Sequence, residues 1–190
     1  MVKPSRASRR LQKERDFRPH AEHYHAARVF YDNASKNRRG SALQLQASLV
    51  FCAFCVEAYM NHMGRTCLSY WTEIERAPVF AKLRLLMAEF GVHLRAGERP
   101  LQTVRHLFRY RDWMAHSKST VIKEEIEYEG EIDDSVRMTT PRDKWEEFIT
   151  LENVKRCLDD VAALVTALNE KAPVADRDLL IVTSHFYTDA

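Results

Sequence analysis

The chain has 190 residues and only five glycines and six prolines, a composition that argues against an all-β protein. Hydrophobic residues make up 45% and charged residues 29%, the balance of a soluble globular chain that is long enough for one substantial core. The formal net charge of +2 excludes no class of partner by itself.

The charge is unevenly distributed. Residues 1–18 contain seven Lys or Arg and two Asp or Glu, a local charge of +5 that leaves −3 for the rest of the chain. The segment lacks the apolar core of a secretory signal, so secretion is not expected. We expect residues 1–19 to form a basic, flexible arm. It would either follow an RNA backbone through phosphate contacts or remain a solvated terminus.

The first predicted helix runs from Pro19 to about Ala34. Its apolar stripe has three- and four-residue steps and consists of Ala21, Tyr24, Ala27, Tyr31 and Ala34. Three histidines, His20, His23 and His25, lie near its start but cannot share one face. We therefore interpret them as a polar helix start and not as metal ligands.

A second helix is predicted from Ser41, as N-cap, to His62 or Met63, and it is apolar on almost every side. We expect it to be the central helix. Its continuous apolar run, residues 49–56, is much shorter than the roughly 20 residues of a membrane span, so no membrane segment is expected. Glu57 interrupts the apolar pattern. A buried carboxylate is costly unless it is paired, so we expect Glu57 to meet a donor such as Arg111 or a buried hydroxyl.

The four cysteines fit a reducing cytoplasm better than a disulfide framework in a chain of this size; they are Cys52, Cys55, Cys67 and Cys157. With His62, the spacing of the first three superficially resembles a zinc knuckle. Such sites need a tight loop, whereas these residues fall in an apolar helix. We expect buried thiols, with no metal and no cofactor.

A third helix is predicted over residues 79–90. A fourth helix starts at Pro100 and ends at a cluster of three residues that could take part in catalysis, Arg111, Asp112 and His116. In this cluster, the Arg111 guanidinium is planar and permanently charged, which suits it to bind a phosphate, and His116 can exchange a proton near neutral pH. Asp112 lies on the face of His116, whereas Arg111 is about 140° away around a regular helix. For Arg111 and His116 to meet one ligand, the last turn must loosen near Ala115.

After this cluster the helical pattern stops. Clusters of β-formers at 120–122, 126–128 and 135–139 surround an acidic turn, which predicts a β-hairpin over residues 120–140. A last amphipathic helix follows Thr150 as N-cap and extends to Leu168. Residues 171–190 are expected to form a tail with a β-like run at 179–183. The predicted fold is all-α: an up-and-down bundle of four to five helices with a β-hairpin inserted between the last two helices.

Two stretches resemble the HEPN superfamily. The segment Arg111-Asp112-Trp113-Met114-Ala115-His116 resembles its Arg-x4-His signature, and Phe51 to Asn61 resembles its earlier buried helix, which ends in Glu, an aromatic residue and Asn. The resemblance covers about residues 20–170. It implies a helical bundle that forms a homodimer, with the two motif helices facing each other.

The resemblance implies a metal-independent endoribonuclease, in a toxin or phage-defence system, that cleaves RNA by attack of the 2′-hydroxyl. Arg111, His116 and Asp112 would be catalytic, with Glu57, Asn61 and Ser117 supporting them. RNA, a second copy of the chain and a neutralising antitoxin or other protein are the expected partners. The alternative is a non-catalytic HEPN-like module for dimerisation or for binding nucleotide or RNA. In that case Arg111 would hold Glu57 and His116 would complement the C-terminal helix dipole.

Overall fold

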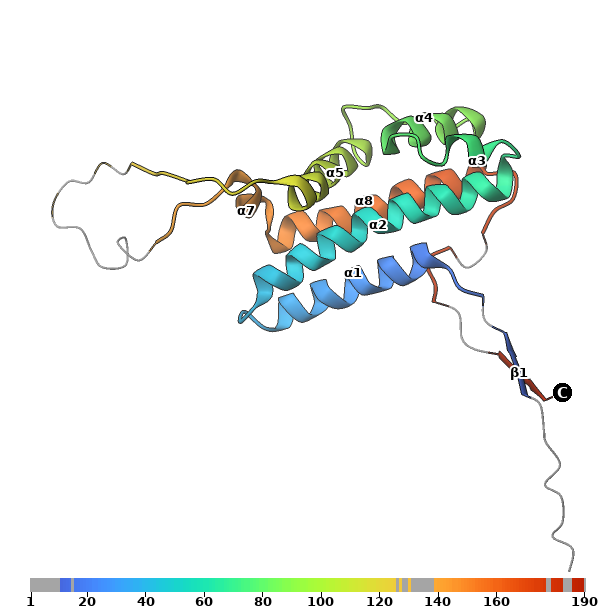
Figure 1. Ribbon diagram of the computed structural model, residues 1–190, viewed down its shortest axis with the longest axis horizontal. Helices are drawn as coiled ribbons and strands as arrows, with labels where there is room; N and C mark the ends of the chain where they lie inside the picture. Colours follow the sequence, from blue (N-terminus) through green and yellow to red (C-terminus); the bar gives the residue numbers. More distant parts are fainter. Residues whose placement is uncertain are drawn as a thin grey trace, which may run out of the picture.

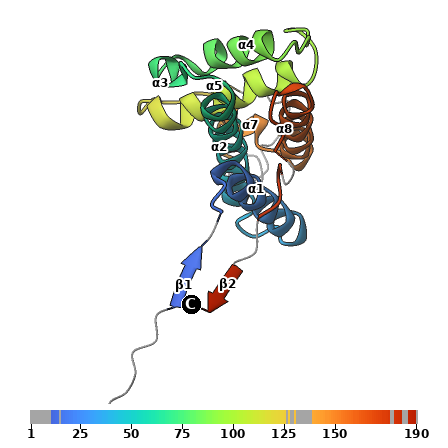
Figure 2. The same cartoon turned by 90° about the vertical axis from the view of Figure 1, so that its right-hand side faces the viewer.

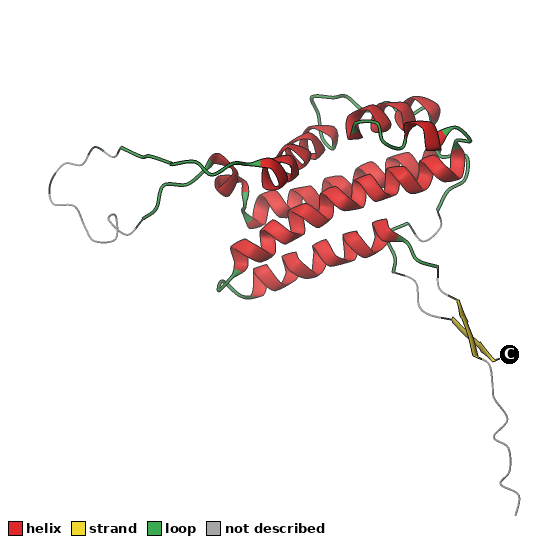
Figure 3. Ribbon diagram, viewed as in Figure 1, coloured by secondary structure: helices red, strands yellow, loops and turns green. Residues whose placement is uncertain are grey.

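The computed structural model describes residues 11–14, 16–125, 127, 130, 139–176, 179–182 and 186–189. Four long helices form a bundle (Figures 1 and 3): α1 (Pro19–Lys36), α2 (Ser41–Cys67), α5 (Leu101–His116) and α8 (Leu151–Lys171). The shorter helices are α3 (Trp71–Ile74), α4 (Val79–Glu89) and α7 (Lys144–Phe148). The predicted helical bundle is therefore confirmed.

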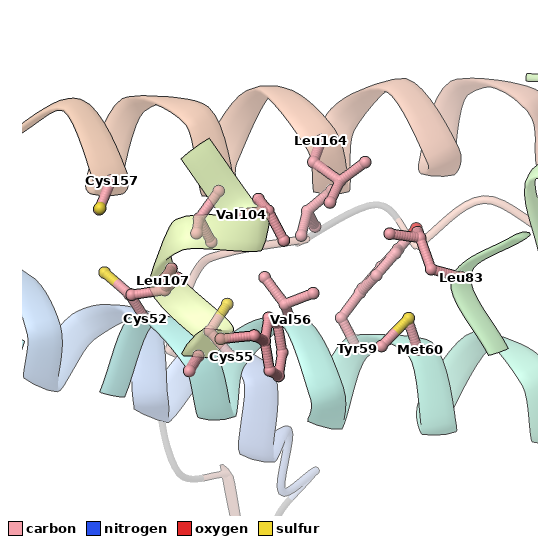
Figure 4. Close-up of a cluster of buried hydrophobic side chains, with 14 of the residues drawn as sticks. Cys52, Cys55, Val56, Tyr59, Met60, Leu83, Val104, Leu107, Cys157 and Leu164 are labelled. Carbon is pink, nitrogen blue, oxygen red and sulfur yellow. The ribbon is translucent and has the colours of Figure 1, made fainter. Parts of the chain in front are cut away.

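Helix α2 lies at the centre of the bundle. Helix α1 packs on one side of it, while α3, α4 and α5 lie on the other side, and α8 runs alongside (Figures 1 and 2). Figure 4 shows how α2 contributes Cys52, Val56 and Met60 to the core, facing Cys157 and Leu164 of α8. This packing explains part of the apolar character of α2, because helices contact it on several sides, although Leu43 and Phe54 remain exposed.

Among the described residues, α2 is the one helix long and apolar enough to cross a membrane by length and composition. Its 18-residue window has a mean hydropathy of 1.4, and 39% of that window is buried in the fold. The central helix of a bundle has the same composition, and α2 packs against five other helices: α1, α3, α4, α5 and α8.

The helices begin and end where the capping residues in the sequence predict, with one exception. Pro19 starts α1, Gly91 at φ 66° follows α4, and the Thr150 hydroxyl accepts a hydrogen bond from the Asn153 amide at 3.1 Å to cap α8. The expected Ser41 cap is wrong. Gly40, at φ 75°, takes the N-cap position of α2 without a side-chain hydrogen bond, because its left-handed backbone closes the tight α1–α2 connection.

The predicted β-hairpin is also wrong. Within residues 120–140, the described residues 120–125, 127, 130, 139 and 140 form no strand, while 126, 128–129 and 131–138 lie outside the described residues. Of the β-forming side chains that the structure describes here, Val121 is 80% exposed and Ile122 is 40% exposed, so neither covers a core. An isolated two-stranded hairpin is marginal in water, and the many acidic residues of this one would repel each other across the strands.

The two described strands lie near the ends of the chain. Strand β1 (Leu11–Glu14) pairs antiparallel with β2 (Phe186–Asp189), with Leu11 opposite Asp189. Part of the segment expected to be a flexible arm is thus a strand. The β-like run expected at 179–183 is not a strand over 179–182, and residue 183 lies outside the described residues.

Candidate functional site

Arg111 lies on the inner side of α5 and is held by two carboxylates. Its Nη2 is 3.3 Å from Glu57 Oε2 on α2, and its Nη1 is 3.3 Å from Asp112 Oδ1. The guanidinium also lies over the Phe108 ring, with Cζ 5.1 Å from the ring centroid. Only 23% of the Arg111 side chain is exposed. The expected contact between Glu57 and Arg111 is therefore confirmed.

The Glu57 carboxylate has a second cationic neighbour, Lys82 of α4. The Lys82 ammonium lies 3.6 Å from Glu57 Oε1 and donates hydrogen bonds to Asn61 Oδ1 at 3.0 Å and to the Glu75 carbonyl at 3.1 Å. Its side chain is only 2% exposed, so these acceptors replace the water that it loses. Glu57 and Asn61, one turn apart, thus connect α2 to both α4 and α5.

Sequence reasoning missed Lys82, although a signal was present. Lys82 precedes Leu83 and lies four residues before Leu86, so it belongs to the buried stripe of α4. A lysine at such a position needs acceptors inside the fold, and two polar residues of α2, Glu57 and Asn61, were the candidates.

His116 lies apart from Arg111. It is the last residue of α5 and is exposed. The helix remains regular to its end, where the Ser117 amide donates to the Trp113 carbonyl at 2.9 Å, so the last turn does not loosen near Ala115. Within one chain the two side chains therefore point about 140° apart around α5. Asp112 contacts Arg111, and among the described residues no contact joins it to His116.

The outer face of α5 carries a cationic stripe, defined as Arg105, Arg109 and His116. All three are exposed, and their spacing places them within about 40° of one another around the helix. Neither arginine forms an ion pair with a described residue. The stripe therefore presents uncompensated positive charge along the helix and ends at a histidine.

A second polar cluster lies on the opposite side of α2, where the start of α1 meets the segment after α8. His20 Nε2 and His62 Nε2 lie 3.4 Å and 3.7 Å from Asp176 Oδ2, and Arg18 Nη1 lies 2.8 Å from Asp176 Oδ1. The His20 ring also meets the Tyr59 ring edge-on, with centroids 5.5 Å apart.

His20 is fully buried, which corrects its interpretation as part of a polar helix start. Burial lowers its pKa, and nearby His62 lowers it further, while Asp176 acts in the opposite direction. A cavity of about 340 Å³ opens beside His62 and Asp176. Sequence reasoning missed the cluster because its members are far apart in the chain.

Neither cluster is a preformed metal centre. Among the described residues, no group of three or more His, Cys, Asp or Glu side chains has an arrangement that could hold a metal ion. Cys52, Cys55 and Cys157 are buried in the core, as expected, while Cys67 is half-buried.

Comparison with protein-family models, with curated proteins and with solved structures finds no match for this chain.

Proposed function

We propose that the protein is a metal-independent endoribonuclease of HEPN type that acts as a homodimer. The observation that carries the proposal is the cationic stripe of α5, which ends at exposed His116 and lies on the same helix as Arg111. Such a stripe suits the phosphate backbone of RNA, and a histidine at its end suits proton transfer. The proposal includes a cytoplasmic toxin or phage-defence role and a neutralising protein partner.

The proposed reaction uses the RNA as its own nucleophile. His116 takes the proton of a 2′-hydroxyl, and the 2′-oxygen attacks the adjacent phosphorus. Arg111 stabilises the charge on the phosphorane, and the 5′-oxygen leaves with a proton from water while the His116 imidazolium returns its proton to the solvent. The products are a 2′,3′-cyclic phosphate and a 5′-hydroxyl.

The divergence of Arg111 and His116 within one chain is the reason for proposing a site shared by two chains. If two copies of α5 face each other, His116 of each copy can lie beside Arg111 of the other. Sedimentation that shows only a 22.2 kDa species at tens of micromolar protein would contradict this arrangement.

The first test is cleavage of single-stranded RNA in excess EDTA, with DNA of the same sequence as the control. We expect 2′,3′-cyclic phosphate ends on RNA and no cleavage of DNA, which lacks the nucleophile. His116→Ala should lower the rate about 10²–10⁴-fold. His106→Ala is the matched control, since His106 is also an exposed histidine of α5, and it should leave the rate unchanged.

The second test uses mixed dimers. His116→Ala and Arg111→Ala should each be inactive alone, and activity should return when the two variants are unfolded together and refolded, because the mixed dimer contains one intact site. A melting curve must accompany Arg111→Ala, since it leaves Glu57 with one cation fewer. Cleavage that persists in both folded variants, or that requires added magnesium or zinc, would contradict the proposed mechanism.

One observation favours the alternative, a non-catalytic dimerisation or RNA- or nucleotide-binding module. Both terminal nitrogens of Arg111 are engaged by carboxylates, and its Nε is buried without a hydrogen-bond partner. In that case RNA should bind in a salt-dependent way and remain intact. Arg109→Gln should weaken that binding.

A further inference from the structure

A cavity of about 230 Å³ lies between α4, the N-terminal half of α5 and the loop that joins them. Its lining is apolar except for two arginines at its rim, Arg84 of α4 and Arg105 of α5. The apolar lining consists of Phe80, Leu83, Met87, Leu94, Ala96 and Leu101. A wider surface hollow shares Arg84, Met87 and Leu94 with this cavity and gives access from solvent.

The two rim arginines lack partners. Neither Arg84 nor Arg105 forms an ion pair or a side-chain hydrogen bond with a described residue, and both are exposed. By contrast, the nearby Arg95 pairs with Glu98 at 3.1 Å, and Arg99 pairs with Asp160 at 2.8 Å. Two like charges that line one cavity create a positive potential, which an anionic group would neutralise.

We propose that this cavity binds an aliphatic monocarboxylate, with the hydrocarbon chain inside and the carboxylate held by Arg84 and Arg105. The apolar lining argues against a nucleobase, since the polar edge of a base would lose its hydrogen bonds to water without replacement. An apolar cavity of about 150 Å³ holds benzene, which has six carbons, so the volume here suits a chain of roughly nine carbons. The proposal does not depend on RNA cleavage.

The test is titration calorimetry of the full-length protein with butanoate, hexanoate, octanoate and decanoate below their micelle-forming concentrations. Affinity should rise about fourfold per methylene, the fold-change that corresponds to burial of a CH₂ group, and should level off near nine carbons. Octan-1-ol should bind more weakly than octanoate, because it lacks the charge that the arginines recognise.

Three variants complete the test. Arg84→Gln should lower octanoate affinity about tenfold, while Arg109→Gln, which removes an exposed arginine of α5 outside the cavity, should not change it. Met87→Trp should fill the cavity and abolish binding while circular dichroism shows an unchanged helix content. Absence of binding by all four acids, affinity independent of chain length, or an equal loss in Arg84→Gln and Arg109→Gln would each overturn the proposal.

Discussion

Lys82 and Arg111, which belong to different helices, share one carboxylate. The Lys82 ammonium lies 3.6 Å from Glu57 Oε1, and Arg111 Nη2 lies 3.3 Å from Glu57 Oε2. The carboxylate therefore holds α4 and α5 to α2 through opposite oxygens. Its loss would leave the nearly buried Lys82 with neutral acceptors only.

Glu57→Gln should lower the free energy of unfolding by about 1–3 kcal/mol, because it removes the negative charge beside a lysine that has little access to water. Urea denaturation measures the effect. Glu152→Gln is the matched control, since Glu152 forms an exposed i,i+4 pair with Arg156 and should contribute little. Equal losses in the two variants would contradict a structural role for Glu57.

Gly64→Ala should destabilise the fold by about 1–3 kcal/mol, because a Cβ at Gly64 would lie 2.1–2.3 Å from ring atoms of buried Trp71. The indole must move, so its fluorescence should change together with the unfolding midpoint. Gly97→Ala is the control, since an added Cβ meets no atom within 4 Å there. An unchanged midpoint in Gly64→Ala would mean that Trp71 is not held against α2.

Stability should fall as the pH drops below about 6.5, the ordinary pKa of histidine, because burial lowers the pKa of His20 in the folded protein. Below that pH the unfolded chain binds a proton at His20 that the folded chain does not bind. The stabilising contribution of His20 is therefore complete above that pH and is lost on acidification. His23, whose pKa is also lowered by burial, adds to the same trend.

The measurement is urea denaturation between pH 7.5 and 5.5. His20→Phe should flatten the dependence. The groups that face His20 are Asp176, His62 and Tyr59, so the same titration of His62→Gln shows how much of the slope comes from repulsion between the two imidazoles. An unchanged slope in His20→Phe would contradict the assignment.

A thiol reagent should modify Cys67 first in the native protein. Cys67 is half-buried, while the other three thiols are buried and have raised pKa values, about 12 for Cys157. Counting reacted thiols at pH 8, before and after addition of guanidinium, tests this order. Rapid reaction of Cys52 or Cys55 in the folded protein would contradict their place in the core.

Periodic apolar patterns were enough to predict the four long helices. A physical argument about burial also predicted the contact between Glu57 and Arg111, because a carboxylate in an apolar helix needs a cation. Lys82 was missed because its neighbours suggested only an apolar stripe. The polar cluster around Asp176 was missed for a different reason, since no local pattern connects residues 20, 62 and 176.

The hairpin prediction failed because β-propensity describes how a side chain fits a half-buried surface, and residues 117–125 have no such surface. The divergence of Arg111 and His116 was expected from a regular helix. What the sequence left open was whether the last turn would loosen, and the hydrogen bond from Ser117 to Trp113 shows a closed turn.

The central position of α2 has a consequence for synthesis of the chain. Helix α1 precedes α2 and can pair with it as soon as both emerge from the ribosome, but α5 and α8 begin only at Leu101 and Leu151. Until then, part of a helix with the hydropathy of a membrane span remains uncovered. The nascent chain should therefore depend on chaperones, and truncation before α8 should give aggregation in place of a smaller folded protein.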